Sequence, residues 1–187
     1  AARGEELKGK VKNPIARQET GADGAPSGHM LNRFTDAVID NIRLTLGQIP
    51  PKDFDRACAM VADRTKRIHV VGGRITHTLA EYLFLHLQVI RPDVTHIQST
   101  SNAWPHYLLD VGPDDVFVIF DMRRYENNTL KLAEMARDKG AKIVLITDQW
   151  RSPVHRMADI CFSGRIVVPS AWDSAVTTML LVETMIA

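Results

Sequence analysis

Apolar residues in this chain follow two patterns, helical spacing at first and then short unbroken runs. Apolar positions recur every three or four residues over 31–49, which predicts a helix that stops at Pro50-Pro51. A second helix is expected up to residue 62, with Asp53 as its N-cap. Beyond residue 67, apolar runs without a break alternate with further helical stretches. This alternation indicates a parallel sheet that is covered on both faces.

The alternating part contains five candidate strands and three long candidate helices. The strands are expected at residues 68–71, 94–98, 115–120, 142–147 and 159–162. The helices are expected at residues 76–90, 127–139 and 170–186. The fold class is therefore α/β.

The first 29 residues differ from the rest. Residues 1–29 are polar and rich in Gly, Ala and Pro, which is typical of a partly disordered interdomain linker. Residues 30–187 carry the periodic pattern and are expected to form one domain. The chain starts at Ala1 and stops at Ala187 inside an apolar helical pattern, so we expect a fragment of a longer polypeptide.

Composition narrows the class of protein. The 187 residues are 45% hydrophobic and 24% charged, with a formal net charge of +1, so no strong general attraction to nucleic acid is expected from this chain. No apolar run is long enough to cross a membrane. Cys58 and Cys161 lack a Cys-x-x-Cys spacing and are expected to be buried, reduced thiols of a cytoplasmic protein. No metal-ligand spacing and no dinucleotide fingerprint occurs, so we expect no metal and no cofactor.

The first candidate site follows the first predicted strand, because ligands of parallel sheets bind beyond the carboxyl ends of the strands. Gly72 and Gly73 allow the backbone to come close to a ligand, Arg74 can reach an anion, and Thr76 can cap the next helix or donate its hydroxyl. The alternative is that the glycines only permit a tight turn and Thr76 only caps. After the second strand, Ser99 and Ser101 either hydrogen-bond a ligand or form a turn.

The loop after the third strand is dense in charge and is the most unusual sequence in the chain. Asp121, Arg123, Arg124 and Glu126 lie within six residues of one another. Either one of these carboxylates pairs with one of the arginines in an internal ion cluster, or at least one arginine contacts an anionic ligand.

On these features, residues 30–187 resemble a sugar isomerase (SIS) domain, specifically the effector-binding domain of RpiR-type (MurR/RpiR) bacterial transcription regulators. The resemblance includes the two leading helices, the glycine turn, the Lys139-Gly140-Ala141-Lys142 corner, Ser152-Pro153 and Ala158-Asp159. It implies a flavodoxin-like, doubly wound five-stranded parallel sheet with helices on both faces. It also implies phosphosugar binding, a homodimer or higher homo-oligomer, and a helix-turn-helix domain ahead of residue 1 through which alone DNA would be bound.

The two ligand loops of this family differ here. The first reads Gly-x-Gly-x-Ser in the family and Gly-Gly-Arg-Ile-Thr at residues 72–76. The second reads Ser-x-Ser-Gly-x-Thr in the family and Asp-Met-Arg-Arg-Tyr-Glu at residues 121–126, so its hydroxyls are absent. The expected ligand is therefore a small anionic metabolite, either a phosphosugar or a carboxylate.

Three functions fit this sequence. The first is a non-catalytic effector domain of a transcription regulator, which we favour. The second is a phosphosugar isomerase, for which Glu81, His77 and Glu126 are the candidate general bases. The third is a vestigial SIS module that only dimerises, with arginine–aspartate pairs closing its pocket.

Overall fold

The computed structural model describes residues 28–98 and 104–187 and contains five parallel strands in the order β2-β1-β3-β4-β5. The strands are β1 (Arg67–Gly72), β2 (Val94–Ile97), β3 (Asp115–Asp121), β4 (Lys142–Asp148) and β5 (Ile160–Gly164). The helices are α3 (Met30–Leu46), α4 (Pro51–Ala62), α5 (His77–Ile90), α6 (Trp104–Leu108), α7 (Asn127–Asp138), α8 (Val176–Ile186) and the short 3-10 helix η2 (Pro153–Arg156).

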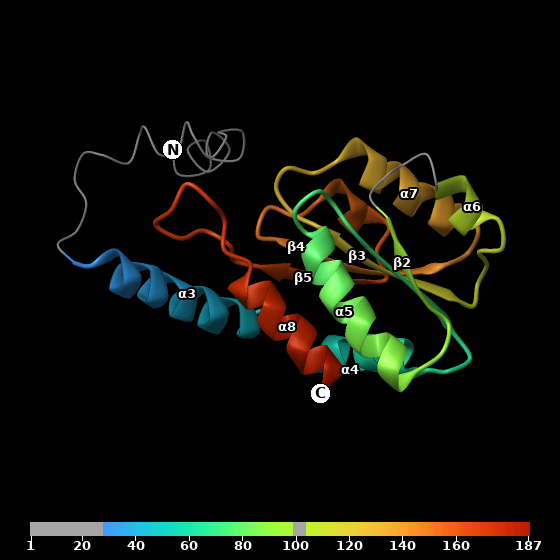
Figure 1. Cartoon of the computed structure of the whole chain (residues 1–187), viewed down its shortest axis with the longest axis horizontal. Coiled ribbons are helices and arrows are strands. Elements are labelled where there is room, and N and C mark those ends of the chain that lie inside the picture. The colour runs from blue at the N-terminus through green and yellow to red at the C-terminus, as the bar shows by residue number, and fades with distance from the viewer. Residues whose placement is uncertain (1–27, 99–103) are drawn as a thin grey trace.

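Helices cover both faces of the sheet, which confirms the predicted α/β architecture (Figure 1). Val70, Val118 and Val144 are register partners on β1, β3 and β4, and they pack with α4, α5 and α8 in one buried core. The next residue of each of these strands points to the other face and packs with α6, α7 and η2. Because side chains alternate along a strand, strands that are buried on both faces read as the unbroken apolar runs in the sequence.

Two helix starts were predicted wrongly. The second helix begins at Pro51 with Pro50 as its N-cap, so Asp53 lies inside the first turn and is not the cap. Proline suits this first helical position because its missing N–H would have no partner there. The last helix begins at Val176 instead of residue 170, and the preceding segment is an irregular loop in which the Ser174 N–H bonds the Ile166 carbonyl at 2.8 Å.

Helix α3 projects from the body of the domain beyond α8, which it contacts (Figure 1). Its buried positions are Asn41 and Thr45, whereas Leu31, Ile39 and Leu46 on its apolar stripe are exposed. The stripe therefore covers the sheet edge only in part. Within the described residues, no helix is both long and apolar enough to cross a membrane.

The cysteine prediction was wrong for Cys161, whose side chain is exposed, while Cys58 is half-buried. Cys161 lies on β5, an edge strand with neighbours on one side only. Where no helix covers one face of an edge strand, every second residue of that strand faces solvent. A strand as short as β5 has the same sequence pattern at the edge of a sheet as in its centre, so the sequence did not indicate this exposure.

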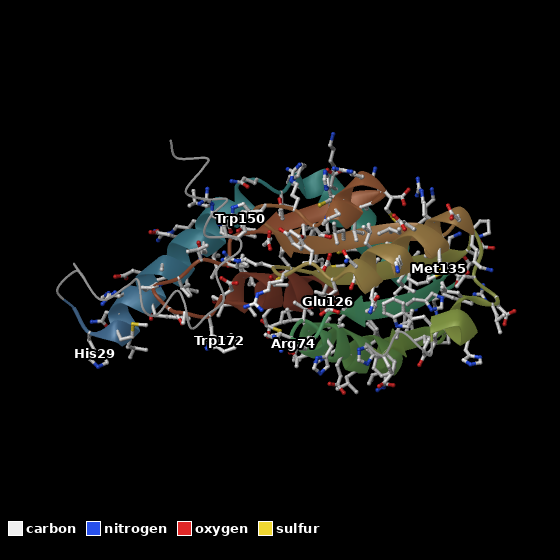
Figure 2. All side chains as sticks on the ribbon, turned by 90° about the horizontal axis from the view of Figure 1, so that it is seen from above. His29, Arg74, Glu126, Met135, Trp150 and Trp172 are labelled. Atoms are coloured by element: carbon white, nitrogen blue, oxygen red, sulfur yellow. The ribbon has the colours of Figure 1, made fainter. Side chains whose placement is uncertain are left out.

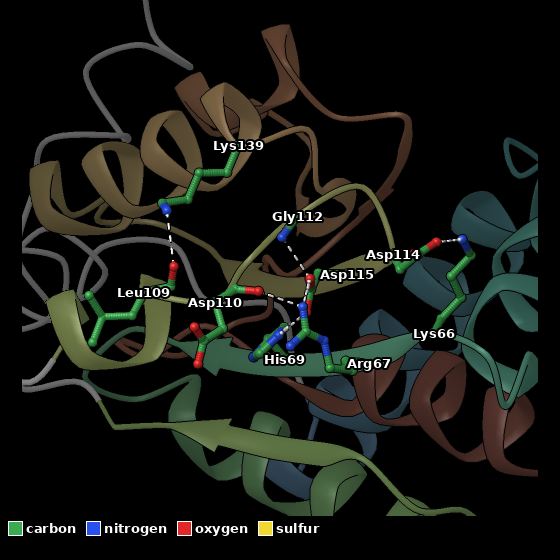
Figure 3. A network of polar contacts seen from close by, with 9 residues as sticks. All are labelled: Lys66, Arg67, His69, Leu109, Asp110, Gly112, Asp114, Asp115 and Lys139. Carbon is green, nitrogen blue, oxygen red and sulfur yellow. Dashed lines mark hydrogen bonds and ion pairs between the residues drawn. The ribbon is translucent and has the colours of Figure 1, made fainter.

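A polar network joins the start of β1 to the start of β3, away from the charged loops (Figure 3). The buried Asp115 carboxylate accepts hydrogen bonds from Arg67 Nη2 at 2.6 Å, from the Gly112 N–H at 2.8 Å, and pairs with His69 Nε2 at 2.6 Å. Burial by itself would raise the pKa of Asp115, but these hydrogen bonds together hold it below its ordinary value. Burial lowers the pKa of His69. This cluster fixes the register at one end of the sheet and leaves the other end to the candidate site.

Candidate functional site

The turn between β1 and α5 needs glycine for reasons of space. A Cβ on Gly72 would lie 2.5 Å from the carbonyl carbon and oxygen of Thr76 and 2.6 Å from the His77 nitrogen. The chain therefore doubles back on itself directly after the strand, and the His77 N–H bonds the Gly73 carbonyl at 2.8 Å. This close approach brings the start of α5 to the carboxyl end of β3.

Thr76 occupies the N-cap position of α5, but its hydroxyl makes no cap hydrogen bond to the helix. It donates to the Phe120 carbonyl at 2.9 Å and accepts from the Gly73 N–H at 2.8 Å. The hydroxyl thus ties the glycine turn to the end of β3. The predicted capping bond is absent because the hydroxyl faces β3 instead of the first turn of the helix.

Asp121 ends β3 and is 2% exposed. Its carboxylate accepts a short hydrogen bond from Ser152 Oγ and another from the Glu126 N–H. Burial raises its pKa from the ordinary 3.8 to about 6, and the nearby carboxylates of Glu126 and Asp148 act in the same direction. A charged Asp121 is therefore unfavourable in the folded protein.

This pKa predicts that Asp121 destabilises the fold as the pH rises. The folded state binds the proton of Asp121 more tightly than the unfolded state does. Stability is therefore lost as the pH rises from 3.8 to about 6. The total loss is about 3 kcal/mol, because each pKa unit corresponds to about 1.4 kcal/mol. Asp121→Asn does not titrate, so its free energy of unfolding should rise relative to the wild type across this window, measured by urea unfolding.

Asp114→Asn is the matched control for this experiment, because the Asp114 side chain is 75% exposed. Its stability relative to the wild type should show no such rise. If the difference between Asp121→Asn and the wild type stayed constant over the window, the raised pKa would be refuted.

Asp148, at the end of β4, organises the charged loop, and the sequence analysis did not single it out. Its Oδ2 accepts from the Arg123 N–H at 2.7 Å, and its Oδ1 accepts from Tyr125 Oη at 2.6 Å and from the Trp150 N–H at 2.9 Å. Burial and the hydrogen bond to Asp148 raise the pKa of Tyr125. The sequence signal that could have identified Asp148 is its position as an acidic residue at the end of a buried strand.

Arg123 is held by residues outside its own loop. Its guanidinium pairs with Asp173, with Nη2 to Oδ1 at 2.6 Å, and lies over the Trp150 ring at 4.1 Å from the centroid. Its side chain is 6% exposed. Arg123 therefore forms an internal ion pair, but not the one considered for this loop, because its partner Asp173 comes from the loop between β5 and α8 instead of being Asp121 or Glu126. Arg123 Nε also donates to Asp173 Oδ2 at 3.2 Å, and such a bidentate pair stacked on an aromatic ring fixes the loop in place.

Arg74 and Arg124 are exposed, and no ion pair reaches either guanidinium within residues 28–98 and 104–187. The backbone N–H of Arg74 is bound by Glu126 Oε1 at 2.9 Å. Figure 2 shows Arg74, Glu126 and Trp172 at the same part of the molecule. Two guanidinium groups thus remain available at the mouth of the site.

The two loops enclose one cavity of about 420 Å³. Of the predicted residues, it brings together Gly73, Arg74, Thr76, Asp121, Arg123, Arg124 and Glu126. Gly72 is the buried last residue of β1 and does not line the cavity, and Ser99 and Ser101 lie outside the described residues. A volume in this range suits a small metabolite.

One wall of this cavity was predicted only in part from the sequence, in which Trp172 is either a packing residue or a pocket wall, whereas Ile166 and Asp173 were not anticipated. Ile166, Trp172 and Asp173 belong to the loop between β5 and α8, and Trp172 is 59% exposed. Ile75 and Leu79, from the turn before α5 and from α5 itself, also line the cavity, so its lining is partly apolar. Pro169, with the serines and aspartate that follow it, was the available signal, since these residues favour turns over helix.

Comparison with known proteins gives one family. A family model described as SIS domain matches residues 63–187 of this chain. No curated protein is significantly similar in sequence.

Several solved structures share the fold. The sugar isomerase domain of an RpiR transcription factor from Sphaerobacter thermophilus is 22% identical, with a TM-score of 0.76 over 83% of this chain and 86% of that chain. NanR of Vibrio vulnificus, in complex with ManNAc-6P, is 16% identical, with a TM-score of 0.72 over 86% of this chain and 61% of that chain. A hypothetical protein of Methanococcus jannaschii, for which a 3-hexulose-6-phosphate isomerase function is inferred, is 14% identical, with a TM-score of 0.64 over 81% of this chain and 86% of that chain.

Proposed function

Because this chain belongs to the SIS domain family, we propose that it is the effector-binding domain of a bacterial transcription regulator and binds a small anionic metabolite without catalysis. The observation that carries this proposal is the cavity with the exposed guanidinium groups of Arg74 and Arg124 at its mouth. Charge-assisted hydrogen bonds from arginine to a carboxylate or phosphate contribute about 1.5–3 kcal/mol each, which is enough to select anions.

Two similar structures support the regulatory part of the proposal. One is the domain of a transcription factor, and the other, NanR, holds ManNAc-6P. We propose that residues 1–29 connect this domain to a DNA-binding domain, that DNA is bound only there, and that the protein acts in the cytoplasm. Ligand binding would then change the relative placement of two DNA-binding domains, which requires a coupling free energy of about 1–3 kcal/mol.

Such a mechanism requires at least two copies of the chain. Helix α3 offers a surface for a second copy, because it projects from the domain and exposes Leu31, Ile39 and Leu46 on one stripe (Figure 1). Covering this stripe with the same stripe of a second copy would remove apolar area from water on both sides. We therefore propose a homodimer or a higher homo-oligomer.

A phosphosugar isomerase is the alternative that one observation favours. Glu126 lines the cavity, so one of the three candidate bases is in reach of a ligand. However, its Oε1 already accepts the Arg74 N–H, and His77 Nδ1 lies 2.7 Å from the Arg74 carbonyl at the outside of the turn. Neither His77 nor Glu81 is a lining residue of the cavity. The Arg123–Asp173 pair narrows the cavity but leaves about 420 Å³, which argues against a closed, vestigial pocket.

The proposal is tested by thermal unfolding with a panel of phosphosugars and small carboxylates at millimolar concentration. We expect at least one compound to raise the melting temperature, because a ligand at one hundred times its Kd adds about 2.7 kcal/mol to the free energy of unfolding. The double variant Arg74→Ala/Arg124→Ala should lose this response, and the control Arg64→Ala, at an exposed arginine between α4 and β1, should keep it.

Three outcomes count against the proposal. No response to any compound favours the vestigial module, and turnover of a phosphosugar favours the enzyme. The coding region ahead of residue 1 should encode a helix-turn-helix domain, and its absence would contradict the regulator.

A further inference from the structure

We infer that Glu126 occupies the anion-binding position at the start of α5, and that it thereby directs the charged group of the ligand to Arg74 and Arg124. This inference rests on the proposed function, because it concerns the specificity of the same cavity. In this role, Glu126 keeps a phosphate out of the inner end of the cavity.

The contact between Glu126 and the glycine turn is close and specific. Glu126 Oε1 accepts the Arg74 N–H at 2.9 Å, and a Cβ on Gly73 would lie 3.0 Å from the same oxygen. Gly73 therefore leaves the space that this carboxylate fills. Glu126 reaches this place as the N-cap residue of α7, so its backbone is held by a helix start.

The charge of Glu126 suits the position. The N-terminus of a helix carries a partial positive charge that favours anions. The first turn of α5 contains no acidic residue of its own, and Thr76 makes no side-chain cap bond there. Glu126 supplies the negative charge from another element. Other N–H groups here already have acceptors, since Gly73 donates to Thr76 Oγ1 and His77 to the Gly73 carbonyl.

A phosphate that approached this position would meet two carboxyl groups. Glu126 lies at the turn, and its own N–H donates to Asp121. A unit charge about 4 Å from another of the same sign is repelled by about 4 kcal/mol at the effective dielectric of a protein surface. The hydrogen bond to Arg74 would also have to break. The inner end of the cavity thus repels an anion.

The chemistry of the cavity is therefore split between its two ends. Carboxylate oxygens at the inner end accept hydrogen bonds, and the guanidinium groups of Arg74 and Arg124 at the mouth donate them. A matching ligand carries hydroxyl or N–H donors on one end and its carboxylate or phosphate on the other. Its uncharged part lies against the apolar wall that includes Trp172.

The test uses inorganic phosphate as the probe, titrated into the whole chain near neutral pH and followed by calorimetry. Glu126→Ala frees the Arg74 N–H and removes the repulsion, so we expect it to bind phosphate about tenfold more tightly than the wild type. Glu134→Ala is the matched control, since Glu134 is exposed on the same helix, and it should bind phosphate as the wild type does.

The double variant Glu126→Ala/Arg124→Ala locates the gained site. It should keep most of the gained affinity, because the phosphate then sits at the start of α5. In the wild type, by contrast, Arg124→Ala should weaken the residual phosphate binding.

If Glu126→Ala does not fold, Glu126→Gln takes its place, because it keeps an acceptor for the Arg74 N–H without the charge. A gain of about threefold is then expected.

Unchanged or weaker phosphate binding in the folded Glu126 variant overturns the inference, whatever the metabolite panel shows. The two proposals can fail separately. A gain in Glu126→Ala without any response of the wild type to the panel leaves the inference standing and refutes the effector function. A response of the wild type to a metabolite, without a gain of phosphate binding in Glu126→Ala, supports the effector function and refutes the inference.

Discussion

Gly72→Ala is expected to lower the free energy of unfolding by about 3 kcal/mol or more. The added Cβ would lie 2.5 Å from two backbone atoms of Thr76, and backbone cannot move aside as a flexible side chain does. Either the start of α5 shifts away from β1, or the strand end distorts. Both changes would also open the cavity, so the response to an effector should disappear. Urea unfolding and the metabolite panel measure the two effects.

Gly112→Ala is the control for this substitution. A Cβ at Gly112 meets nothing within 4 Å, and the N–H that bonds Asp115 is kept. Its stability should stay within about 0.5 kcal/mol of the wild type. Equal effects of the two substitutions would mean that crowding at Gly72 is not what the turn depends on.

Asp148→Ala should cost about 3–5 kcal/mol of stability. The carboxylate is fully buried and accepts from the Arg123 N–H, the Tyr125 hydroxyl and the Trp150 N–H. Without it, these donors lose this acceptor in the interior, and each such loss costs about 1–3 kcal/mol. The charged loop should lose its shape as well. Urea unfolding measures the first effect, and tryptophan fluorescence reports the environment of Trp150.

Asp114→Ala provides the comparison, because its 75% exposed side chain forms a surface pair with Lys66. Surface pairs contribute about 0–1 kcal/mol, so this variant should unfold close to the wild type. A small effect of Asp148→Ala would show that water enters and replaces the carboxylate.

The sequence predicted the sheet because each buried strand carries its own signal. Residues 116–120 are apolar without a break, and β3 is buried along its whole length. Local chemistry also predicted the turn at Gly72-Gly73, and backbone crowding at Gly72 leaves no room for a side chain. Such features depend on neighbours in the chain, and a single sequence contains those neighbours.

The partners of the charged residues were predicted less well. For the arginines of the charged loop, the sequence left open an ion pair within the loop or a contact with a ligand, but Arg123 pairs with Asp173, fifty positions later. Trp172 and Asp173 were expected within a helix, although Trp172 was also a candidate pocket wall, and both lie in a loop that lines the cavity. A charged side chain pairs with whatever the fold brings near it, and sequence spacing carries no information on a neighbour that arrives from another strand end.

The sequence by itself therefore determined the order of strands and helices and the two polar loops that follow strand ends, because these follow from periodicity, glycine and local polarity, and its motifs resemble those of the SIS family. The tertiary structure decided which charges remain available. Arg123 is paired with Asp173, the Arg74 N–H is bound by Glu126, and Arg74 and Arg124 are exposed residues that line the cavity. The physical reason is that electrostatic pairing depends on distances of a few ångströms across the fold.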